Sequence, residues 1–266
     1  MFEISVIIPT YNREKSIENS IRSVLDQNSG EFSIAEVLII DDNSADDTEM
    51  AVKTIPDERI KYHRNSENLG AGGARNRGVE LAASEWIAFQ DSDDVWAADK
   101  LKKQCSYLAA HPECEMMTHA IKAHFPDKEI VTVIEEQEDM FGKIAAHNFV
   151  DAPSILMKKS VFEELGGFDT SLKALEDWDL ALRYLDGHKI GVINEPLLDA
   201  DMTIGGVSSD AGNHFDAGCR IIAKNLEMLK RHGCFESAVQ SLLMQAAEKN
   251  VLGNVSKLLE YHITHR

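Results

Sequence analysis

The chain has 266 residues, of which 44% are hydrophobic and 27% charged, a composition typical of a globular protein with one large α/β domain or a smaller domain plus an appendage. Its formal net charge of −18 argues against nucleic acid as a partner, because phosphate backbones require basic surfaces. No apolar run approaches the roughly 20 residues that span a bilayer, and no signal peptide precedes the first strand, so we expect a cytoplasmic protein.

Four cysteines lie at positions 105, 114, 219 and 234. They are too far apart for a zinc ribbon and too few for a disulfide framework, so we expect free thiols. The ten histidines show no metal-ligand spacing either. His214, in a polar segment, is the one histidine that we consider as a contact for metal or phosphate.

The first 98 residues alternate between predicted strands and helices. Ile4 to Ile8 is an unbroken apolar run rich in β-branched residues, as expected of a parallel strand buried on both faces. Similar runs predict strands at 37–40, 60–63 and 86–89, and helical spacing or capping residues predict helices at 13–27, from Thr48, and at 74–83. This alternation predicts βαβ units, and therefore an α/β fold with a doubly wound, mostly parallel sheet.

The pattern changes after Asp94. Helices are predicted at 99–110, 161–165 and 177–185, and strands at 115–120, 130–134, 152–157 and 190–194. From Asn213 onward the apolar residues fit two or three amphipathic helices. We interpret these as a packed helical appendage, with docking of an acceptor, a partner or a membrane as the alternatives.

Polar residues gather where the predicted strands end. Asn12 follows the first strand, Asp41-Asp42 the second, a glycine-rich segment the third, and Asp91-Ser92-Asp93-Asp94 the fourth. Ligands of doubly wound sheets bind outside the carboxyl ends of the strands, so the four clusters should converge on one rim. An Asp-x-Asp triplet alone is common on solvated loops. At such a rim, however, its carboxylates suit a hard divalent cation that neutralises a diphosphate, which indicates nucleotide-sugar chemistry.

Two more segments suit a nucleotide. One of Asp41 and Asp42 can stabilise the following turn while the other accepts a hydrogen bond from the N3–H group of a uracil ring. In residues 68–78 the glycines permit close backbone approach, and a helix N-terminus offers N–H groups to anions. Arg75 and Arg77 are candidates for pairing with phosphate, and we favour Arg75.

Three acids surround a tryptophan at the predicted helix start in Glu176-Asp177-Trp178-Asp179. One interpretation is that they only complement the helix dipole. The other is that a carboxylate at a partly apolar site deprotonates a sugar hydroxyl, and we choose Asp177 for that role.

In this order and spacing the motifs resemble those of inverting family 2 glycosyltransferases with the GT-A fold. The resemblance covers residues 4–198 and rests on six stretches of sequence. They are Val6-Ile7-Ile8-Pro9-Thr10-Tyr11-Asn12-Arg13, Ile40-Asp41-Asp42-Asn43-Ser44, Asn68-Leu69-Gly70 with Ala74-Arg75-Asn76, Asp91-Ser92-Asp93-Asp94, Gly166-Gly167-Phe168-Asp169 and Glu176-Asp177.

The resemblance implies a site for a nucleotide-sugar donor. Pro9, Tyr11 and Asp42 would line the nucleotide pocket, with Tyr11 stacking on the base, and Arg75 would lie near uridine diphosphate. A UDP-sugar is the expected donor, with thymidine or guanosine nucleotides as alternatives.

The resemblance also implies the chemistry. Asp93 would ligate Mn²⁺ or Mg²⁺, and Asp91 would contact the ribose or the water shell of the metal. Asp177 would take the proton from an acceptor hydroxyl, whose oxygen displaces the diphosphate in one inverting step.

The implied organisation is a GT-A domain at 1–212, with a nucleotide-binding half at 1–98 and an acceptor half at 99–212, followed by a C-terminal helical extension at 213–266. The segment 201–208 matches only loosely the loop that closes over the diphosphate in relatives. No processive-synthase motif of the Gln-x-x-Arg-Trp type occurs, so transfer of a single sugar is expected. Bacterial relatives of this size extend lipopolysaccharide, capsule or other glycans on lipid carriers. The expected acceptor is therefore a glycan or lipid-linked saccharide, with peripheral contact at the inner membrane.

Three other functions are weighed. A nucleotidyltransferase carries a glycine-rich loop with basic residues after its first strand, where this chain has Pro9-Thr10-Tyr11-Asn12. A phosphoacceptor receiver domain has its acidic pair after the first strand, whereas Asp41-Asp42 follows the second. A non-catalytic sugar-binding scaffold would need neither Asp93 nor Asp177.

Overall fold

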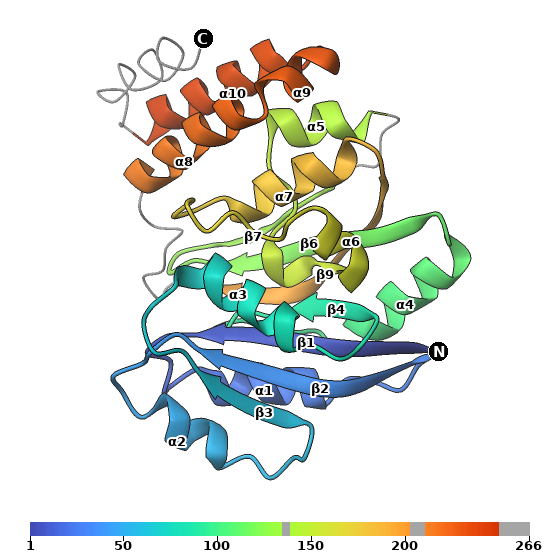
Figure 1. Ribbon diagram of the computed structural model, residues 1–266, viewed down its shortest axis with the longest axis vertical. Coiled ribbons are helices and arrows are strands. Elements are labelled where there is room, and N and C mark those ends of the chain that lie inside the picture. Colours follow the sequence, from blue (N-terminus) through green and yellow to red (C-terminus); the bar gives the residue numbers. More distant parts are fainter. Residues whose placement is uncertain (135–138, 203–210, 250–266) are drawn as a thin grey trace.

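The computed structural model describes residues 1–134, 139–202 and 211–249, which surround one mixed sheet (Figure 1). The strand order is β3-β2-β1-β4-β8-β6-β9-β5, and β7 pairs with β6 beside this path. The strands are β1 (Phe2–Thr10), β2 (Phe32–Asp41), β3 (Ile60–Arg64), β4 (Trp86–Phe89), β5 (Val95–Trp96), β6 (Cys114–His124), β7 (Glu129–Val131), β8 (Leu156–Lys158) and β9 (Lys189–Asp201).

The N-terminal half of the sheet is parallel. Strands β3, β2, β1 and β4 all run in the same direction. Side chains alternate between the two faces: Ile7 belongs to the core under α3 (Gly70–Leu81), whereas Val6 and Ile8 belong to the core under α1 (Ile17–Leu25). Burial on both faces explains the unbroken apolar run of β1.

Helix α3 lies very close to the sheet. A Cβ atom at Gly78 would lie 2.4 Å from Cγ2 of Ile7, so no larger residue fits there without moving the helix. This close packing fixes α3, and with it Arg75, over the end of β1.

The C-terminal half of the sheet is mixed. Strand β8 is antiparallel to β4 and to β6, β9 is parallel to β6, and β5 is antiparallel to β9. Its helices are α4 (Lys100–Ala110), α5 (Met140–Ala146), α6 (Lys159–Glu164) and α7 (Glu176–Leu185), and a 3₁₀ turn lies at Ala152–Ser154. The remaining helix of the first half is α2 (Thr48–Lys53). The predicted α/β sheet is therefore confirmed: its first half is wholly parallel, whereas its second half combines the parallel β6–β9 pair with antiparallel pairs.

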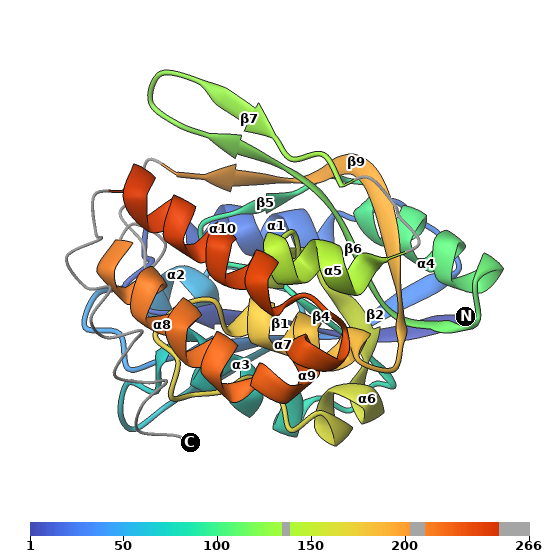
Figure 2. The ribbon, with the colours of Figure 1, turned by 90° about the horizontal axis from the view of Figure 1, so that it is seen from above.

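Three C-terminal helices cover α5 and α7. They are α8 (Ala211–Lys224), α9 (Leu226–Arg231) and α10 (Phe235–Glu248), and Figure 2 shows α10 beside both α5 and α8. Phe215 and Leu242 share one hydrophobic core with Trp178 of α7 and with the sheet. The helical appendage is thus packed onto the helices that cover the second half of the sheet.

A buried carboxylate ties α8 to α7. Asp179 is fully buried and accepts hydrogen bonds from Arg183 Nε at 2.9 Å, Lys224 Nζ at 2.9 Å and Asn225 Nδ2 at 3.1 Å. Asp179 therefore joins the two helices, and a buried charge of this kind is stable only with such partners.

Several predicted boundaries were wrong for local reasons. The helix predicted at 13–27 spans only Ile17–Leu25, because a turn occupies residues 13–16. The strand predicted at 152–157 begins as a 3₁₀ turn, where Pro153 has no N–H to donate and Ile155 N bonds Ala152 O at 3.1 Å. The glycine-rich segment is already helical from Gly70.

Two further features concern the cysteines and the length of the helices. All four cysteines are buried free thiols. Within residues 1–134, 139–202 and 211–249, no helix has the length and apolar character that crossing a bilayer requires.

Candidate active site

The candidate residues lie where the parallel strands end. From β1 the chain adds β2 and β3 on one side and then returns to add β4 on the other side of β1. Open α/β sheets bind ligands at such a switch in strand order. Asp42 follows β2, Asp91 and Asp93 follow β4, and Arg75 is in α3. From the other half, Asp177 reaches the same region in the first turn of α7.

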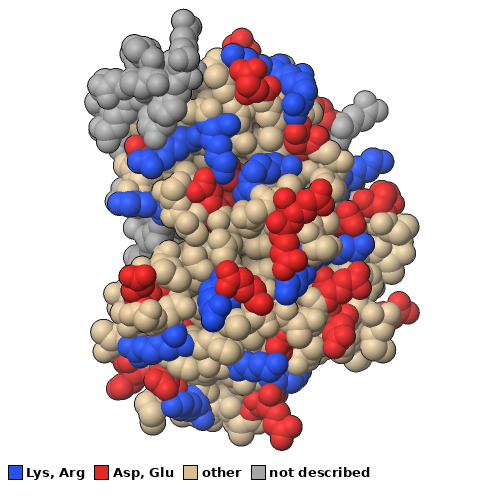
Figure 3. Space-filling view, viewed as in Figure 1, with Lys and Arg blue, Asp and Glu red and all other residues tan. Residues whose placement is uncertain are grey.

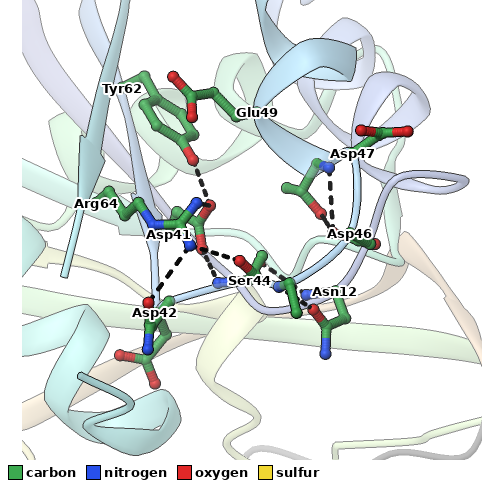
Figure 4. A network of polar contacts seen from close by, with 12 residues as sticks. Asn12, Asp41, Asp42, Ser44, Asp46, Asp47, Glu49, Tyr62 and Arg64 are labelled. Atoms are coloured by element: carbon green, nitrogen blue, oxygen red, sulfur yellow. Dashed lines mark hydrogen bonds and ion pairs between the residues drawn. The ribbon is translucent and has the colours of Figure 1, made fainter. Parts of the chain in front are cut away.

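Asp41 and Asp42 have different partners (Figure 4). Asp41 is fully buried and accepts from Ser44 N at 2.7 Å and from the hydroxyl of Tyr62. Asp42 accepts from the backbone N–H groups of Leu69 and Gly70, each at 2.8 Å, and from Asn65 Nδ2 at 2.9 Å. Asp41 thus holds the turn, as one of the pair was expected to do.

The contacts of Asp42 explain why α3 starts early. The first N–H groups of a helix have no partner within it, and a negative charge at this end is favourable. Asp42 supplies both a hydrogen-bond acceptor and a negative charge from the loop after β2, 27 and 28 residues earlier in the sequence. The carboxylate is only 4% exposed, so base recognition would require it to exchange some of these partners.

Pro9 and Tyr11 lie at the end of β1. Pro9 is buried within the strand, while the Tyr11 side chain is 48% exposed and open to stacking. The chain turns at Asn12, which has a positive φ of 54°. Asn12 exchanges hydrogen bonds with the loop after β2, through Ser44 Oγ and the N–H of Ala45, both at 2.8 Å.

Arg75 bridges two acidic motifs. Its guanidinium lies 2.6 Å from Asp91 Oδ1 and 2.7 Å from Glu176 Oε1, and the residue is 5% exposed. Burial alone would lower the pKa of Arg75, but the charges of Asp91 and Glu176 raise it, so the group remains a cation. Here Arg75 holds the Asp91 loop against the start of α7.

The acids after β4 form a cluster. Asp93 pairs with Arg13 at 3.0 Å, yet burial and the charge of Asp91 raise its pKa. Burial, with the charges of Asp91 and Asp93, raises the pKa of Asp94 to about 9. Arg13 and Arg75 therefore do not supply enough positive charge to balance the carboxylates of this cluster.

A hard divalent cation fits this donor set, since carboxylate oxygens are its preferred ligands and its charge would offset the crowding. In the described part of the chain, no three His, Cys, Asp or Glu side chains are already arranged around a single metal position. Asp93 and Asp91 are the residues that would have to hold the ion.

Asp177 is held by donors from another segment. Its carboxylate accepts from Asn148 Nδ2 at 3.0 Å, from Ala152 N at 3.2 Å and from Trp178 N at 2.7 Å. Burial, and then the charges of Glu176 and Asp151, raise the pKa of Asp177 to about 8. A carboxylate with such a pKa is suited to accept a proton near neutral pH.

The backbone before Asp177 is unusual. Leu175, the residue that precedes α7, has a φ of 60° and a ψ of 22°, a left-handed conformation that is rare for a bulky residue. Such conformations persist where surrounding contacts over-determine them, often at functional sites. It directs the chain so that Glu176 meets Arg75 while Asp177 faces Asn148.

Sequence reasoning missed four contributors. Arg13 and Glu176 lie within the quoted motifs but had no assigned role, and Asn148 and Asp151 lie in a segment without a motif. Nothing in the sequence near Asn148 and Asp151 signals that they meet α7.

Two other expectations concern the chain after β9. The loop that was compared with a lid falls largely in 203–210, outside the described residues. His214 lines a cavity between α8, α10 and the start of α7, beside Asn148 and Asp151.

Comparisons with known proteins show the family and the fold of this chain. The family model described as "Glycosyl transferase family 2" matches residues 5–165. The chain belongs to this family. An uncharacterized glycosyltransferase of Haemophilus influenzae is 31% identical over 200 residues, which cover 73% of this chain and 66% of that protein.

Named relatives act in bacterial glycan synthesis. The Escherichia coli protein WfgD, a UDP-Glc:alpha-D-GlcNAc-diphosphoundecaprenol beta-1,3-glucosyltransferase, is 31% identical over 198 residues, or 72% of this chain and 73% of WfgD. Bacillus subtilis TuaG, a putative teichuronic acid biosynthesis glycosyltransferase, is 42% identical over 107 residues, covering 40% of this chain and 41% of TuaG.

Solved structures establish the GT-A fold for this family 2 member. The S. aureus TarS fragment 1–349 in complex with UDP-GlcNAc superposes with a TM-score of 0.67 at 23% identity, over 84% of this chain and 66% of the fragment. A Pyrobaculum calidifontis mannosyltransferase in complex with GDP-Man and Mn²⁺ has a TM-score of 0.63 at 19% identity, over 98% of this chain and 82% of that one.

Proposed function

We propose that this family 2 glycosyltransferase transfers one sugar from a UDP-sugar to a hydroxyl of a lipid-linked saccharide, with inversion at the anomeric carbon. The main support for this proposal is that Arg75 and Glu176 connect the Asp91–Asp94 loop to Asp177 at one rim of the sheet. WfgD supports the choice of donor and acceptor, since its name specifies UDP-glucose and a diphosphoundecaprenol-linked sugar.

In the proposed reaction Asp177 accepts the proton of the acceptor hydroxyl. The oxygen forms a bond to the anomeric carbon as the bond to the diphosphate breaks, and UDP leaves with the electron pair. Asn148 and the N–H of Ala152 hold the Asp177 carboxylate in place for this step. A single displacement inverts the configuration.

Pro9, Tyr11 and Asp42 are proposed to bind the nucleoside. Tyr11 has the exposure that stacking requires, and Asp42 lies at the adjacent strand end. Arg75 is proposed to act near the diphosphate by orienting Asp91. Because the guanidinium of Arg75 already contacts two carboxylates, we assign it direct binding of phosphate only as a second role.

Asp93, with Asp91, is proposed to hold Mn²⁺ or Mg²⁺. When bound, the cation supplies positive charge that stabilises the leaving diphosphate. Burial and the charge of Asp91 raise the pKa of Asp93 even though Arg13 pairs with it, which supports the view that this carboxylate lies in a crowded acidic region.

Isothermal titration with UDP tests this assignment. The wild type, Asp93→Ala and the control Asp127→Ala, an exposed acid between β6 and β7, are each titrated with Mn²⁺ and with EDTA. Metal-dependent binding that is lost only in Asp93→Ala supports the proposal. Equal binding in EDTA or in Asp93→Ala contradicts the metal role, and absence of UDP binding in every condition contradicts a uridine donor.

A further inference from the structure

A cavity of about 200 Å³ lies between the C-terminal helices and the start of α7. Its walls come from Ala146, His147, Asn148 and Asp151, from α7, and from α8 and α10, which lie side by side in Figure 2. Trp178, Phe215 and Leu242 contribute apolar surface. Asn148, Asp151 and Ser241 contribute polar groups.

The cavity adjoins the proposed base. Asn148 lines the cavity and donates to Asp177 Oδ1 at 3.0 Å, so one side chain belongs to both sites. Asp151 also lines the cavity, and its charge contributes to the raised pKa of Asp177. A molecule in the cavity would therefore meet the groups that position Asp177.

The carboxylate of Asp151 is open to a ligand. Among the described residues no group donates a hydrogen bond to it, whereas its backbone oxygen accepts from Ser154. Burial and the charge of Asp91 raise its pKa to about 6. Asp151 is partly exposed, so its carboxylate is accessible, and a sugar hydroxyl would supply the donor that the described residues do not.

The size and the mixed lining select the occupant. Pockets for drug-sized ligands measure roughly 300–1,000 Å³, so this cavity suits a single ring rather than an oligosaccharide or a lipid chain. A pyranose has apolar C–H faces for aromatic and aliphatic walls, and hydroxyls for carboxylate and amide groups. The donor nucleotide is excluded because its proposed contacts lie at the ends of β1, β2 and β4.

We propose that this cavity binds the sugar ring of the acceptor, with Asp151 as a positioning residue that holds the ring beside Asn148, the side chain that contacts Asp177. The inference rests on the proposed function and deepens it. It gives the C-terminal helices a part in acceptor recognition, because α8 and α10 form the wall opposite α7.

Two tryptophan variants of α10 test the cavity directly. Ser241 lines it, whereas Met244 on the same helix is 58% exposed and is not part of its lining. Binding of methyl glycosides of glucose, galactose and their N-acetyl forms is measured by saturation-transfer NMR on wild type, Ser241→Trp and Met244→Trp with UDP present. We expect binding in wild type and Met244→Trp, and its loss in Ser241→Trp.

A second variant removes the carboxylate without filling the cavity. Asp151→Asn should weaken glycoside binding by about tenfold or more, because hydrogen bonds to charged groups are the stronger ones. UDP titration, run in parallel, should be the same in every variant, and thermal unfolding checks that each one folds.

The outcomes separate this inference from the proposed function. Failure of the wild type to bind UDP counts against the proposed donor. Normal UDP binding with no glycoside bound by the wild type, or with equal binding in folded Ser241→Trp and Asp151→Asn, overturns the cavity assignment.

Discussion

The two halves of the sheet hold their candidate residues in different ways. In the parallel half, Asp41 and Asp42 are fixed largely by backbone N–H groups of the loop after β2 and of the start of α3, segments that belong to the same βαβ units. In the mixed half, Asp177 depends on Asn148, 29 residues away in sequence, and Glu176 on Arg75, 101 residues away. The first half is thus a site assembled by βαβ units, and the second is assembled by tertiary contacts between segments.

The largest expected effect of breaking the second half is on turnover. Asp177→Asn keeps the size of the side chain but removes the proton acceptor, so kcat should fall by about 10² to 10⁴ while UDP affinity is unchanged. Steady-state transfer assays and UDP titration measure the two quantities. Asp186→Asn, at the other end of α7, is the control and should keep kcat. A scaffold protein would show no difference between the two variants.

The pH dependence of activity should follow the same carboxylate. Because the pKa of Asp177 is raised to about 8, the ionised base becomes more abundant up to that pH. The transfer rate should rise about tenfold per pH unit below it and level off above. Rates measured from about pH 5.5 to 9 test this, and a flat profile below pH 7 would contradict Asp177 as the base.

Folding stability should change with pH in the opposite direction. When the pKa of a carboxyl group is higher in the folded protein than its ordinary value of 3.8, the group contributes most to the free energy of unfolding at pH values below 3.8. This contribution is lost as the pH rises from about 4 towards 8. Comparing urea unfolding of the wild type and Asp177→Asn across this range isolates it, since the variant lacks the group that titrates.

Arg75→Met should remove the ion pairs that connect the Asp91 loop of the first half to Glu176 of the second. It leaves Asp91 and Glu176 without their shared cation, and loss of one partner of a buried pair typically costs about 3–5 kcal/mol. Arg77→Met removes an exposed pair with Glu80 from the same helix and should change stability by less than about 1 kcal/mol. Urea unfolding measures both, and equal losses would mean that Arg75 does not join the motifs.

The smallest expected effect concerns the C-terminal helices. Asp179→Asn weakens the contacts with Lys224 and Arg183 but retains the shape, so unfolding free energy should fall by about 1–3 kcal/mol. Hydrogen exchange should increase most in α8. Asp216→Asn, in an exposed pair with Arg220, is the control. Unchanged exchange in α8 would show that Asp179 is not its anchor.

The parallel half of the sheet could be predicted well from sequence. Buried parallel strands are continuous apolar runs, and strands 4–8, 37–40, 60–63 and 86–89 all lie within observed strands. The residues that end them reach one rim because parallel strands share a direction. The resemblance of these motifs to family 2 glycosyltransferases also implied the family and the GT-A fold, and the comparisons confirm both.

Elsewhere local pattern was a weaker guide. The strand predicted at 190–194 extends over Lys189–Asp201, because pairing with β6 and β5 continues it past Pro196. The glycine-rich segment became helical because Asp42 satisfies its first N–H groups. Both outcomes depend on partners that a local window does not contain.

The sequence by itself determined the parallel strands and the acids at their ends, since both depend on the type and spacing of neighbouring residues, and its motifs carried the resemblance to the family. Tertiary structure alone decided that Arg75 joins Asp91 to Glu176, that Asn148 and Asp151 lie beside Asp177, and that α8 and α10 form a cavity there. The reason is physical. A buried charge needs partners, and those partners come from whichever segments the packed core brings into contact.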